Sequence, residues 1–157
     1  MGGVCVKAKL RRKRATSPTE TSAFKAWFRG SKVVNSDGTP MRVYHGTARS
    51  DLRWSPNRPA YFSPNANDAD DLAVADVLED GDMPRVLSAY LAVVNPAILN
   101  WCESQTLNVE PHTVERLKAL GHDGAFGTRE DGSVFEYVAF SNNQIRSLSG
   151  EPEPENG

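Results

Sequence analysis

Apolar residues recur along this chain with two spacings, one of three to four residues and one of two residues. Phe24, Trp27 and Phe28 follow the longer spacing, which predicts a short helix with one apolar face. Thr21 or Ser22 precedes it and supplies the hydroxyl that caps a helix N-terminus. Helices are also expected in two later segments, residues 66–79 and 111–120.

Short alternating or continuous apolar runs predict strands between these helices. The strand segments are residues 41–45, 60–63, 85–94 and 134–140. A turn at residues 35–38 precedes the first of them and suggests a hairpin, and Gly46-Thr47 is expected to end that strand. Asn95-Pro96 is expected to end the third strand. Short strands with a few peripheral helices predict an α+β fold.

The chain ends are polar and oppositely charged, which predicts two disordered tails around one domain. Residues 1–20 form the basic N-terminal tail, and residues 149–157 form the acidic C-terminal tail. The folded domain is expected to span residues 21–148, a length that suits a single core.

Composition excludes several classes of function. The formal net charge of -2 gives no electrostatic footprint for nucleic acid. No apolar run reaches the roughly 18 residues that span a bilayer, and the basic N-terminus lacks the apolar stretch of a secretory signal. Two cysteines, Cys5 and Cys102, fit a reducing compartment. The expected location is therefore the cytoplasm.

The first residues leave two alternatives for the N-terminal tail. Gly2 can accept a myristoyl chain and Cys5 a palmitoyl chain, and the following basic residues would add attraction to anionic lipid. The myristoylation motif, however, has Ser or Thr where this chain has Val6. This mismatch favours a flexible basic tail over peripheral attachment to a membrane.

Three residues of the predicted strands have side chains suited to a polar site. His45 precedes Gly46, where a ligand can approach the backbone closely. Tyr61 adjoins Phe62, so one of the two rings faces away from the core and can stack on a flat heterocycle. Glu136 interrupts an apolar strand, where a carboxylate is expensive to bury. Each also has a structural explanation: a core histidine, two core aromatics, or a solvent-facing glutamate on an edge.

The order and spacing of six segments resemble the ADP-ribosyltransferases of the diphtheria-toxin and poly(ADP-ribose) polymerase class. Within that class, the chain is most similar to the small domains found in phage proteins and polyvalent proteins. The similar segments are residues 24–34, 40–47, 61–63, 95–96, 121–124 and 136–147. The resemblance implies split antiparallel β-sheets around an NAD cleft, with a few peripheral helices.

The resemblance also implies a His-Tyr-Glu active site. His45 matches the histidine that binds a ribose of NAD, Tyr61 the aromatic that stacks on nicotinamide, and Glu136 the catalytic glutamate. Gly46 matches the residue whose backbone clasps the nicotinamide amide. The other positions expected to contact NAD are Thr47, Ser63 and Leu72. Leu72 departs from the family, because a second tyrosine stands there in related enzymes.

The resemblance implies mono-ADP-ribosylation of a macromolecule, which we expect to be a protein, with release of nicotinamide. It also implies a role as a toxin or effector, which would be delivered into a host cell. Two alternatives stay open: an NAD glycohydrolase, and an inactive module that binds NAD or a partner. No metal site is expected, because Cys102, His112 and His122 lack ligand spacing. The acidic stretch at residues 68–82 also lacks the spacing of a calcium loop.

Overall fold

The computed structural model describes residues 17–49, 54 and 58–148. The predictions for Gly2 and Cys5, for most of the N-terminal tail and for the C-terminal tail lie outside these residues. The part of the chain that is described contains no helix long and apolar enough to cross a membrane.

Three strands form the first sheet, in the order β1-β3-β7, and both pairings are antiparallel. The strands are β1 (Val43–Thr47), β3 (Arg85–Leu91) and β7 (Ile145–Ser147). Strand β1 lies at the edge of this sheet, and its outer side reaches the second sheet through a single bridge between Tyr44 and Ser63.

Four strands form the second sheet, in the order β2-β6-β5-β4. The strands are β2 (Ala60–Phe62), β4 (Pro96–Leu99), β5 (Gly124–Thr128) and β6 (Val134–Ala139). The β2–β6 and β6–β5 pairs are antiparallel, whereas β4 and β5 are parallel. A two-helix connection between β4 and β5 allows this parallel pair, because a parallel crossover needs a dozen or more residues.

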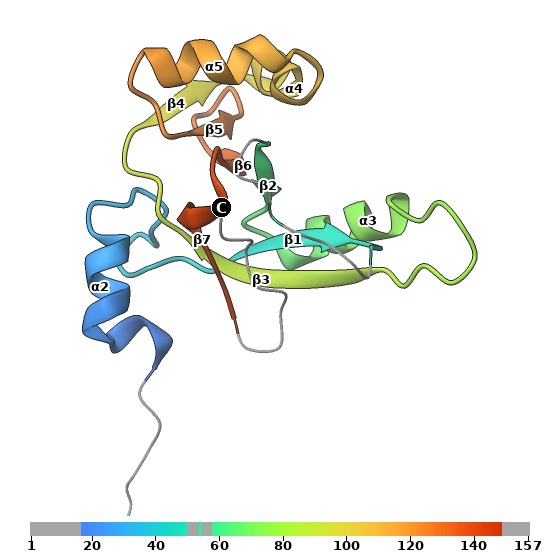
Figure 1. The fold of residues 1–157 in the computed structure, drawn as a ribbon, viewed down its shortest axis with the longest axis horizontal. Helices are drawn as coiled ribbons and strands as arrows, with labels where there is room; N and C mark the ends of the chain where they lie inside the picture. Colours follow the sequence, from blue (N-terminus) through green and yellow to red (C-terminus); the bar gives the residue numbers. More distant parts are fainter. Residues whose placement is uncertain (1–16, 50–53, 55–57, 149–157) are drawn as a thin grey trace, which may run out of the picture.

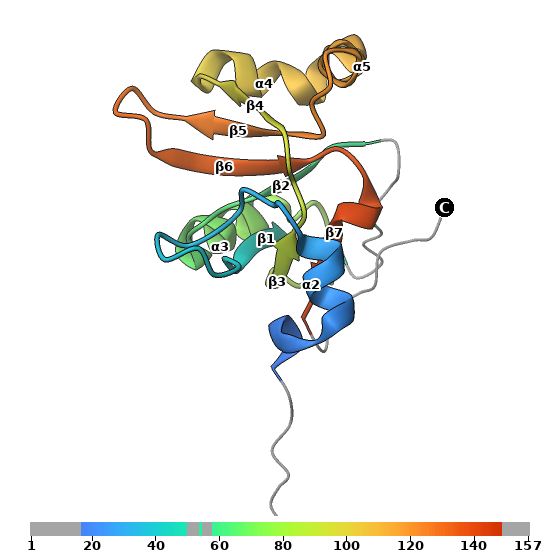
Figure 2. The same ribbon diagram turned by 90° about the vertical axis from the view of Figure 1, so that its left-hand side faces the viewer.

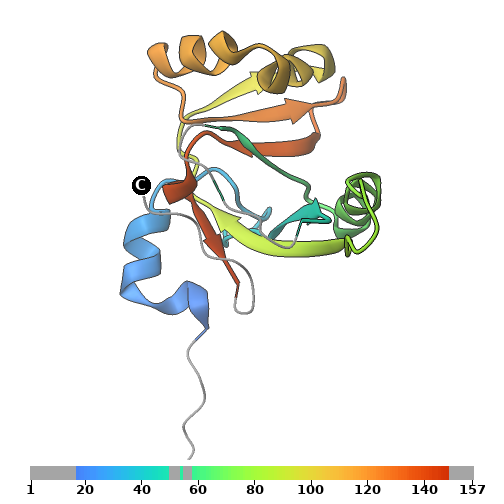
Figure 3. The same ribbon diagram turned by 45° about the vertical axis from the view of Figure 1, so that its right-hand side comes forward.

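Helices cover the two sheets from several sides (Figures 1 and 2). The helical segments are η1 (Pro18–Glu20), α2 (Ser22–Phe28), α3 (Ala66–Ala75), α4 (Trp101–Val109), α5 (Pro111–Ala119) and η2 (Asn142–Gln144). Helices α4 and α5 lie over the outer face of the four-stranded sheet, and α3 packs beside β1 and β3 (Figure 3).

Two apolar cores follow from this arrangement. The larger core lies between the sheets, where Phe62, Phe126 and Tyr137 meet Leu87 and Leu91. The second core lies between the four-stranded sheet and helices α4 and α5. Residues alternate between these two cores along β2, β5 and β6, as expected for strands covered on both faces. The fold is therefore α+β, as the sequence predicts.

Four of the predicted elements are confirmed with small shifts at their ends: α2, β2, α5 and β6. Thr21 caps α2, since its hydroxyl accepts a hydrogen bond of 3.1 Å from the Phe24 N–H. Helix α3 is confirmed in place but ends at Ala75, before the predicted residue 79. The acidic segment after it forms turns in which Asp82 accepts the N–H groups of Leu78 and Glu79.

Three predictions about strands are wrong. Strand β1 continues through Gly46 and Thr47, and it pairs with β3, while the proposed hairpin is reduced to one bridge at Val34 and Pro40. Strand β3 ends at Leu91. The Asp123 carboxylate accepts the N–H groups of Val94 and Asn95 and turns the chain there, so that Pro96 begins a new strand. The spacing of apolar residues did not predict β4, β5 or α4.

Candidate active site

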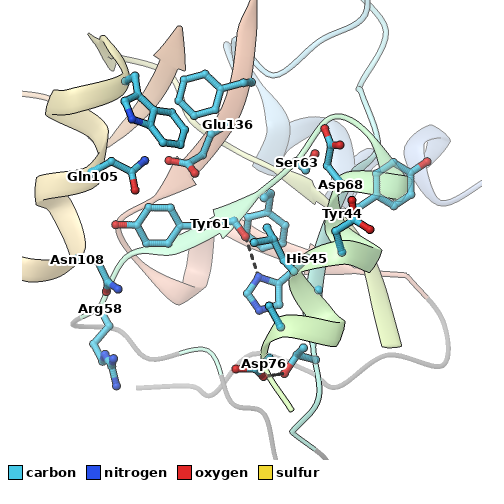
Figure 4. A pocket seen from close by; sticks show the side chains of 18 of the residues that line it. Tyr44, His45, Arg58, Tyr61, Ser63, Asp68, Asp76, Gln105, Asn108 and Glu136 are labelled. Carbon is cyan, nitrogen blue, oxygen red and sulfur yellow. Dashed lines mark hydrogen bonds between the residues drawn. The ribbon is translucent and has the colours of Figure 1, made fainter. Parts of the chain in front are cut away.

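A cavity of about 1210 Å³ opens along β2, the edge strand of the four-stranded sheet. Strand β1 and helix α3 form one side of the cavity, and helix α4 with the ends of β5 and β6 forms the other. Its lining includes all seven site residues expected from the sequence: His45, Gly46, Thr47, Tyr61, Ser63, Leu72 and Glu136. Figure 4 shows Glu136 and Tyr61 on one side of β2 and His45 on the other.

The backbone of β2 orients the imidazole of His45. Its Nδ1 lies 2.7 Å from the carbonyl oxygen of Tyr61, and because a carbonyl only accepts, Nδ1 carries the proton. The ring also packs edge-on against Trp54, with ring centroids 4.9 Å apart. Burial lowers the pKa of His45, so the ring is neutral at pH 7. Its Nε2 is then a hydrogen-bond acceptor.

Gly46 places backbone polar groups at the cavity wall. The N–H and C=O of Tyr44 bond to Ser63, outside the three-stranded sheet. Since backbone groups alternate along a strand, those of Gly46 point to the same outer side. A Cβ at Gly46 would overlap the Ala69 carbonyl oxygen of α3. Glycine is therefore required here by the helix, whatever the backbone binds.

Tyr61 and Glu136 share one face of the four-stranded sheet. Tyr61 pairs with Val138, and Glu136 lies two residues before Val138, which makes it the diagonal neighbour of Tyr61. The Tyr61 hydroxyl and the Glu136 Oε2 are both buried without a hydrogen-bond partner among the described residues. Burial, and secondarily the Glu136 charge, raises the pKa of Tyr61. The phenol is therefore un-ionised.

The carboxyl group of Glu136 is held in an unfavourable environment. Strand β6 is an interior strand, between β2 and β5, so this glutamate is not a solvent-facing residue on an edge. Burial raises its pKa to about 7, and among the described residues no Lys, Arg or His forms a salt bridge with it. A carboxylate without partners, aimed into a cavity, is suited to stabilising a positive charge that a ligand brings.

Thr47 and Ser63 line the cavity, but their hydroxyls are engaged in local contacts. Thr47 Oγ1 donates to Asp76 Oδ2 at 3.3 Å and accepts the Arg49 N–H. Ser63 Oγ donates to the Asn65 carbonyl and accepts the Asn65 N–H, both at 3.0 Å. These contacts make both hydroxyls part of the framework that joins β1 and β2 to helix α3.

Helix α3 presents one face to the cavity, with Asp68, Leu72 and Asp76 among its lining residues. Leu72 is 60% exposed, so the wall at this position is aliphatic and open to solvent. Asp76 joins the end of the helix to β1: it accepts the Ala48 N–H at 2.9 Å and lies 3.6 Å from the Arg49 guanidinium.

The sequence pattern missed the wall that α4 contributes. Trp101, Gln105 and Asn108 line the cavity opposite α3, and Gln105 points toward Glu136 in Figure 4. Two signals in the sequence could have revealed this helix. Asn100 and Glu103 form a capping box, and the spacing of the three lining residues is that of one helix face.

The described residues contain no group of three or more His, Cys, Asp and Glu side chains that could hold a metal ion. His122 Nδ1 lies 3.1 Å from the Asn95 carbonyl oxygen, and Cys102 is an exposed free thiol. Neither residue lines the cavity.

Comparison with known proteins gives one family. The family model described as "ADP-Ribosyltransferase in polyvalent proteins" matches residues 35–154. No curated protein and no solved structure matches the chain. The matched range contains both sheets, helices α3, α4 and α5, and all seven cavity residues that the sequence singled out. The chain therefore belongs to the ADP-ribosyltransferase family of polyvalent proteins.

Proposed function

We propose that this chain cleaves NAD between nicotinamide and ribose and transfers ADP-ribose to one residue of an acceptor protein. The observation that carries the proposal is the buried Glu136 Oε2, which has no partner and lies beside Tyr61 in the cavity that also contains His45. ADP-ribosyltransferases use NAD as their substrate, and this arrangement supplies a face for the nicotinamide ring and a negative charge beside it.

In this proposal the neutral His45 binds NAD through its free Nε2, which accepts a hydrogen bond from a ribose hydroxyl. The hydrogen bond from Nδ1 to the Tyr61 carbonyl keeps the ring in that tautomer. The backbone of Gly46 offers one donor and one acceptor, which complement a primary amide such as that of nicotinamide. The Tyr61 ring packs on the flat nicotinamide.

The transfer step breaks the bond between ribose C1′ and the nicotinamide nitrogen. The electron pair leaves with nicotinamide, which departs as a neutral base, and positive charge develops on the ribose as in glycoside hydrolysis. The Glu136 carboxylate stabilises that charge in its ionised form. The acceptor nucleophile then bonds to C1′, and its proton passes to the carboxylate and on to water.

The decisive experiment compares wild type with Glu136→Gln, using NAD labelled in the adenylate phosphate and a cell lysate as the source of acceptor. We expect wild type to label protein and release nicotinamide. The amide keeps the shape of the side chain but not its charge, so the rate should fall by about 10²–10³-fold. Unchanged activity of the variant would refute the role of Glu136.

Two alternatives predict different products. Release of nicotinamide without labelling of any protein identifies an NAD glycohydrolase, in which water replaces the acceptor. Binding of NAD without release of nicotinamide identifies a binding module, the outcome that the missing ring at Leu72 favours. Calorimetry with NAD, run on the same preparations, separates these two outcomes from a protein that does not bind NAD.

The proposed biological role is that of a toxin or effector acting inside a host cell. Depletion of NAD or modification of a host protein would slow growth, so expression of wild type should arrest cells and expression of Glu136→Gln should not. For the N-terminal tail, a fluorescent fusion and its Gly2→Ala variant test lipidation, and identical distributions would exclude it.

A further inference from the structure

A surface of unusual composition adjoins Glu136 in the same cavity. It consists of Trp101 from α4, Phe135 from β6 and Arg129, which directly follows β5, and we call it the aromatic shelf. The rings of Trp101 and Phe135 lie 5.3 Å apart at an angle of 43°. The Arg129 guanidinium lies 5.8 Å from the centre of the Phe135 ring. Trp101 is nevertheless 61% exposed.

A β-bulge places Phe135 on this surface. Gly127 pairs with Glu136 and Thr128 pairs with Val134, so Phe135 is one extra residue on β6. Such a residue leaves the regular alternation of the strand, and bulges re-aim side chains next to active sites. Gly127 also leaves room for the ring, because a Cβ there would lie 2.8 Å from Phe135 Cζ.

The other ring projects from the first residue of helix α4. Trp101 is the first residue of that helix, between the two residues of its capping box. Asn100 Oδ1 accepts the Glu103 N–H at 2.8 Å, and Glu103 Oε1 accepts the Asn100 N–H at 2.9 Å. Thr128 donates to the Leu99 carbonyl at 3.1 Å and ties β5 to the preceding strand. The backbone that carries the exposed indole is therefore fixed by hydrogen bonds on both sides of Trp101.

The cavity is larger than a typical site for one small molecule. Its volume of about 1210 Å³ exceeds the roughly 300–1,000 Å³ of a typical site for one small molecule. A second substrate has to reach the ribose beside Glu136, and the aromatic shelf is the surface at that end of the cavity. Trp, Phe and Arg are residue types enriched where proteins bind other proteins.

We infer that the aromatic shelf binds the acceptor: a protein segment with an aromatic or aliphatic side chain next to the residue that is modified. This inference rests on the proposed transferase function and adds the class of acceptor. The opposite wall carries the carboxylates of Asp68 and Asp71, and the formal net charge is -2. Both features disfavour a nucleic-acid acceptor, because a polyanion is repelled.

The test uses two sets of synthetic peptides with Glu, Asp, Ser, Arg or Cys at the centre, flanked in one set by Phe and in the other by Ser. The full chain is incubated with labelled NAD and each set, and transfer and nicotinamide release are both measured. We expect Phe-flanked peptides to be modified about ten-fold faster. Trp101→Ala should remove this preference and reduce transfer more than nicotinamide release.

Val109→Ala is the matched control, because Val109 is an exposed residue of the same helix that does not line the cavity. It should keep the preference. Equal rates for the two sets of peptides, an unchanged preference in Trp101→Ala, or labelling of single-stranded DNA instead of peptide would each overturn the inference.

A binding measurement separates failure of the aromatic shelf from failure of the transferase proposal. Fluorescence anisotropy of a labelled Phe-flanked peptide is followed with wild type, Trp101→Ala and Val109→Ala, without turnover. If wild type releases no nicotinamide, the transferase proposal fails. If the peptide binds wild type and Val109→Ala equally and binds Trp101→Ala about ten-fold more weakly, the result still supports the aromatic shelf as the acceptor-binding surface. Absence of peptide binding refutes that role.

Discussion

At the scale of single residues, Glu136 combines an apolar neighbourhood with an ionisable group. Its Oε2 is buried without a partner, and burial raises its pKa to about 7. An unpaired buried carboxyl destabilises a fold, whereas an apolar residue at this interior position would stabilise it. The conflict between local stability and side-chain identity is typical of residues retained for function.

This conflict predicts a pH-dependent difference in stability between wild type and Glu136→Gln. The folded-state pKa, about 7, lies above the ordinary value of 4.5. The stabilisation from the protonated group is therefore complete below pH 4.5 and is lost as the pH rises to 7. Because the group is partly exposed, solvent screening reduces this effect. The free energy of unfolding of wild type should therefore fall by about 1–2 kcal/mol over this pH range.

Thermal unfolding at pH 4.5, 6 and 8 measures this effect. The melting temperature of Glu136→Gln minus that of wild type should increase from pH 4.5 to pH 8. Ser63 lines the same cavity and has no ionisable group. Ser63→Ala is therefore the control, and its difference from wild type should not depend on pH. A difference that stays constant for the Gln variant would contradict a raised pKa.

Leu72 is the second cavity residue for which a substitution tests the proposed function. It lines the cavity from α3 and is 60% exposed. A ring there can pack on a flat ligand, and aromatic stacking contributes about 0.5–1.5 kcal/mol. Leu72→Tyr should therefore lower the KM for NAD by about three- to ten-fold. Val74 is an exposed residue of the same helix that does not line the cavity, so Val74→Tyr should leave the KM for NAD unchanged. Equal effects of the two substitutions would exclude packing of residue 72 against nicotinamide.

At the scale of elements, the packing of α3 on β1 shapes the cavity. The helix contacts the strand at Gly46, where a side chain would overlap Ala69 and approach the Ala73 nitrogen to 2.7 Å. The Asp76 carboxylate holds the end of the helix through the Ala48 N–H and the Thr47 hydroxyl. Since α3 carries one wall and β1 carries His45, this contact sets the distance between them.

Gly46→Ala should separate the helix from the strand. The added methyl group meets backbone atoms that cannot rotate away, so we expect a loss of about 3 kcal/mol in stability, the upper part of the range for overpacking. The NAD affinity should fall as well. Urea unfolding and calorimetry measure both effects.

Gly38→Ala provides the comparison, because Gly38 has a φ of 88° and nothing within 4 Å of an added Cβ. Its cost comes from the left-handed backbone conformation, about 1–2 kcal/mol, and NAD affinity should not change. Equal losses of NAD affinity in the two variants would show that the α3–β1 contact does not shape the site.

At the scale of the whole molecule, the cavity is assembled from segments far apart in the chain. Lining residues come from β1 of the three-stranded sheet, from β2 and β6 of the four-stranded sheet, and from helix α4. A ligand that fills this cavity is expected to contact both sheets. Its binding should therefore stabilise the fold as one unit.

Thermal unfolding with NAD tests this coupling. At a free NAD concentration about 100 times the Kd, the native state should gain about 2.7 kcal/mol. For a domain of this size that gain corresponds to an increase of about 5–10 °C in Tm. Glu136→Gln should keep the increase, because its expected defect is in the chemical step. No increase in either protein would contradict NAD binding.

The helices and strands that the sequence predicted correctly are those whose sequence features lie within a few residues of one another. Helices α2 and α5 and strands β2 and β6 were predicted because their caps and apolar periods lie within a few residues. The two halves of the 85–94 run could not be separated, since the turn after β3 depends on Asp123, about 30 residues later. Likewise, nothing near Gly46 in sequence reveals the helix that packs on it.

The sequence by itself determined the α+β class, and it was sufficient to propose His45, Tyr61 and Glu136 as the active-site residues, because residue type and the order of motifs are properties of the chain alone. Only the tertiary structure decided that Glu136 is an interior residue without a partner, that Thr47 and Ser63 bond to their neighbours, and that α4 and a bulge bring Trp101 and Phe135 beside Glu136. Burial and strand register depend on contacts between distant segments, and those exist only once the sheets have paired.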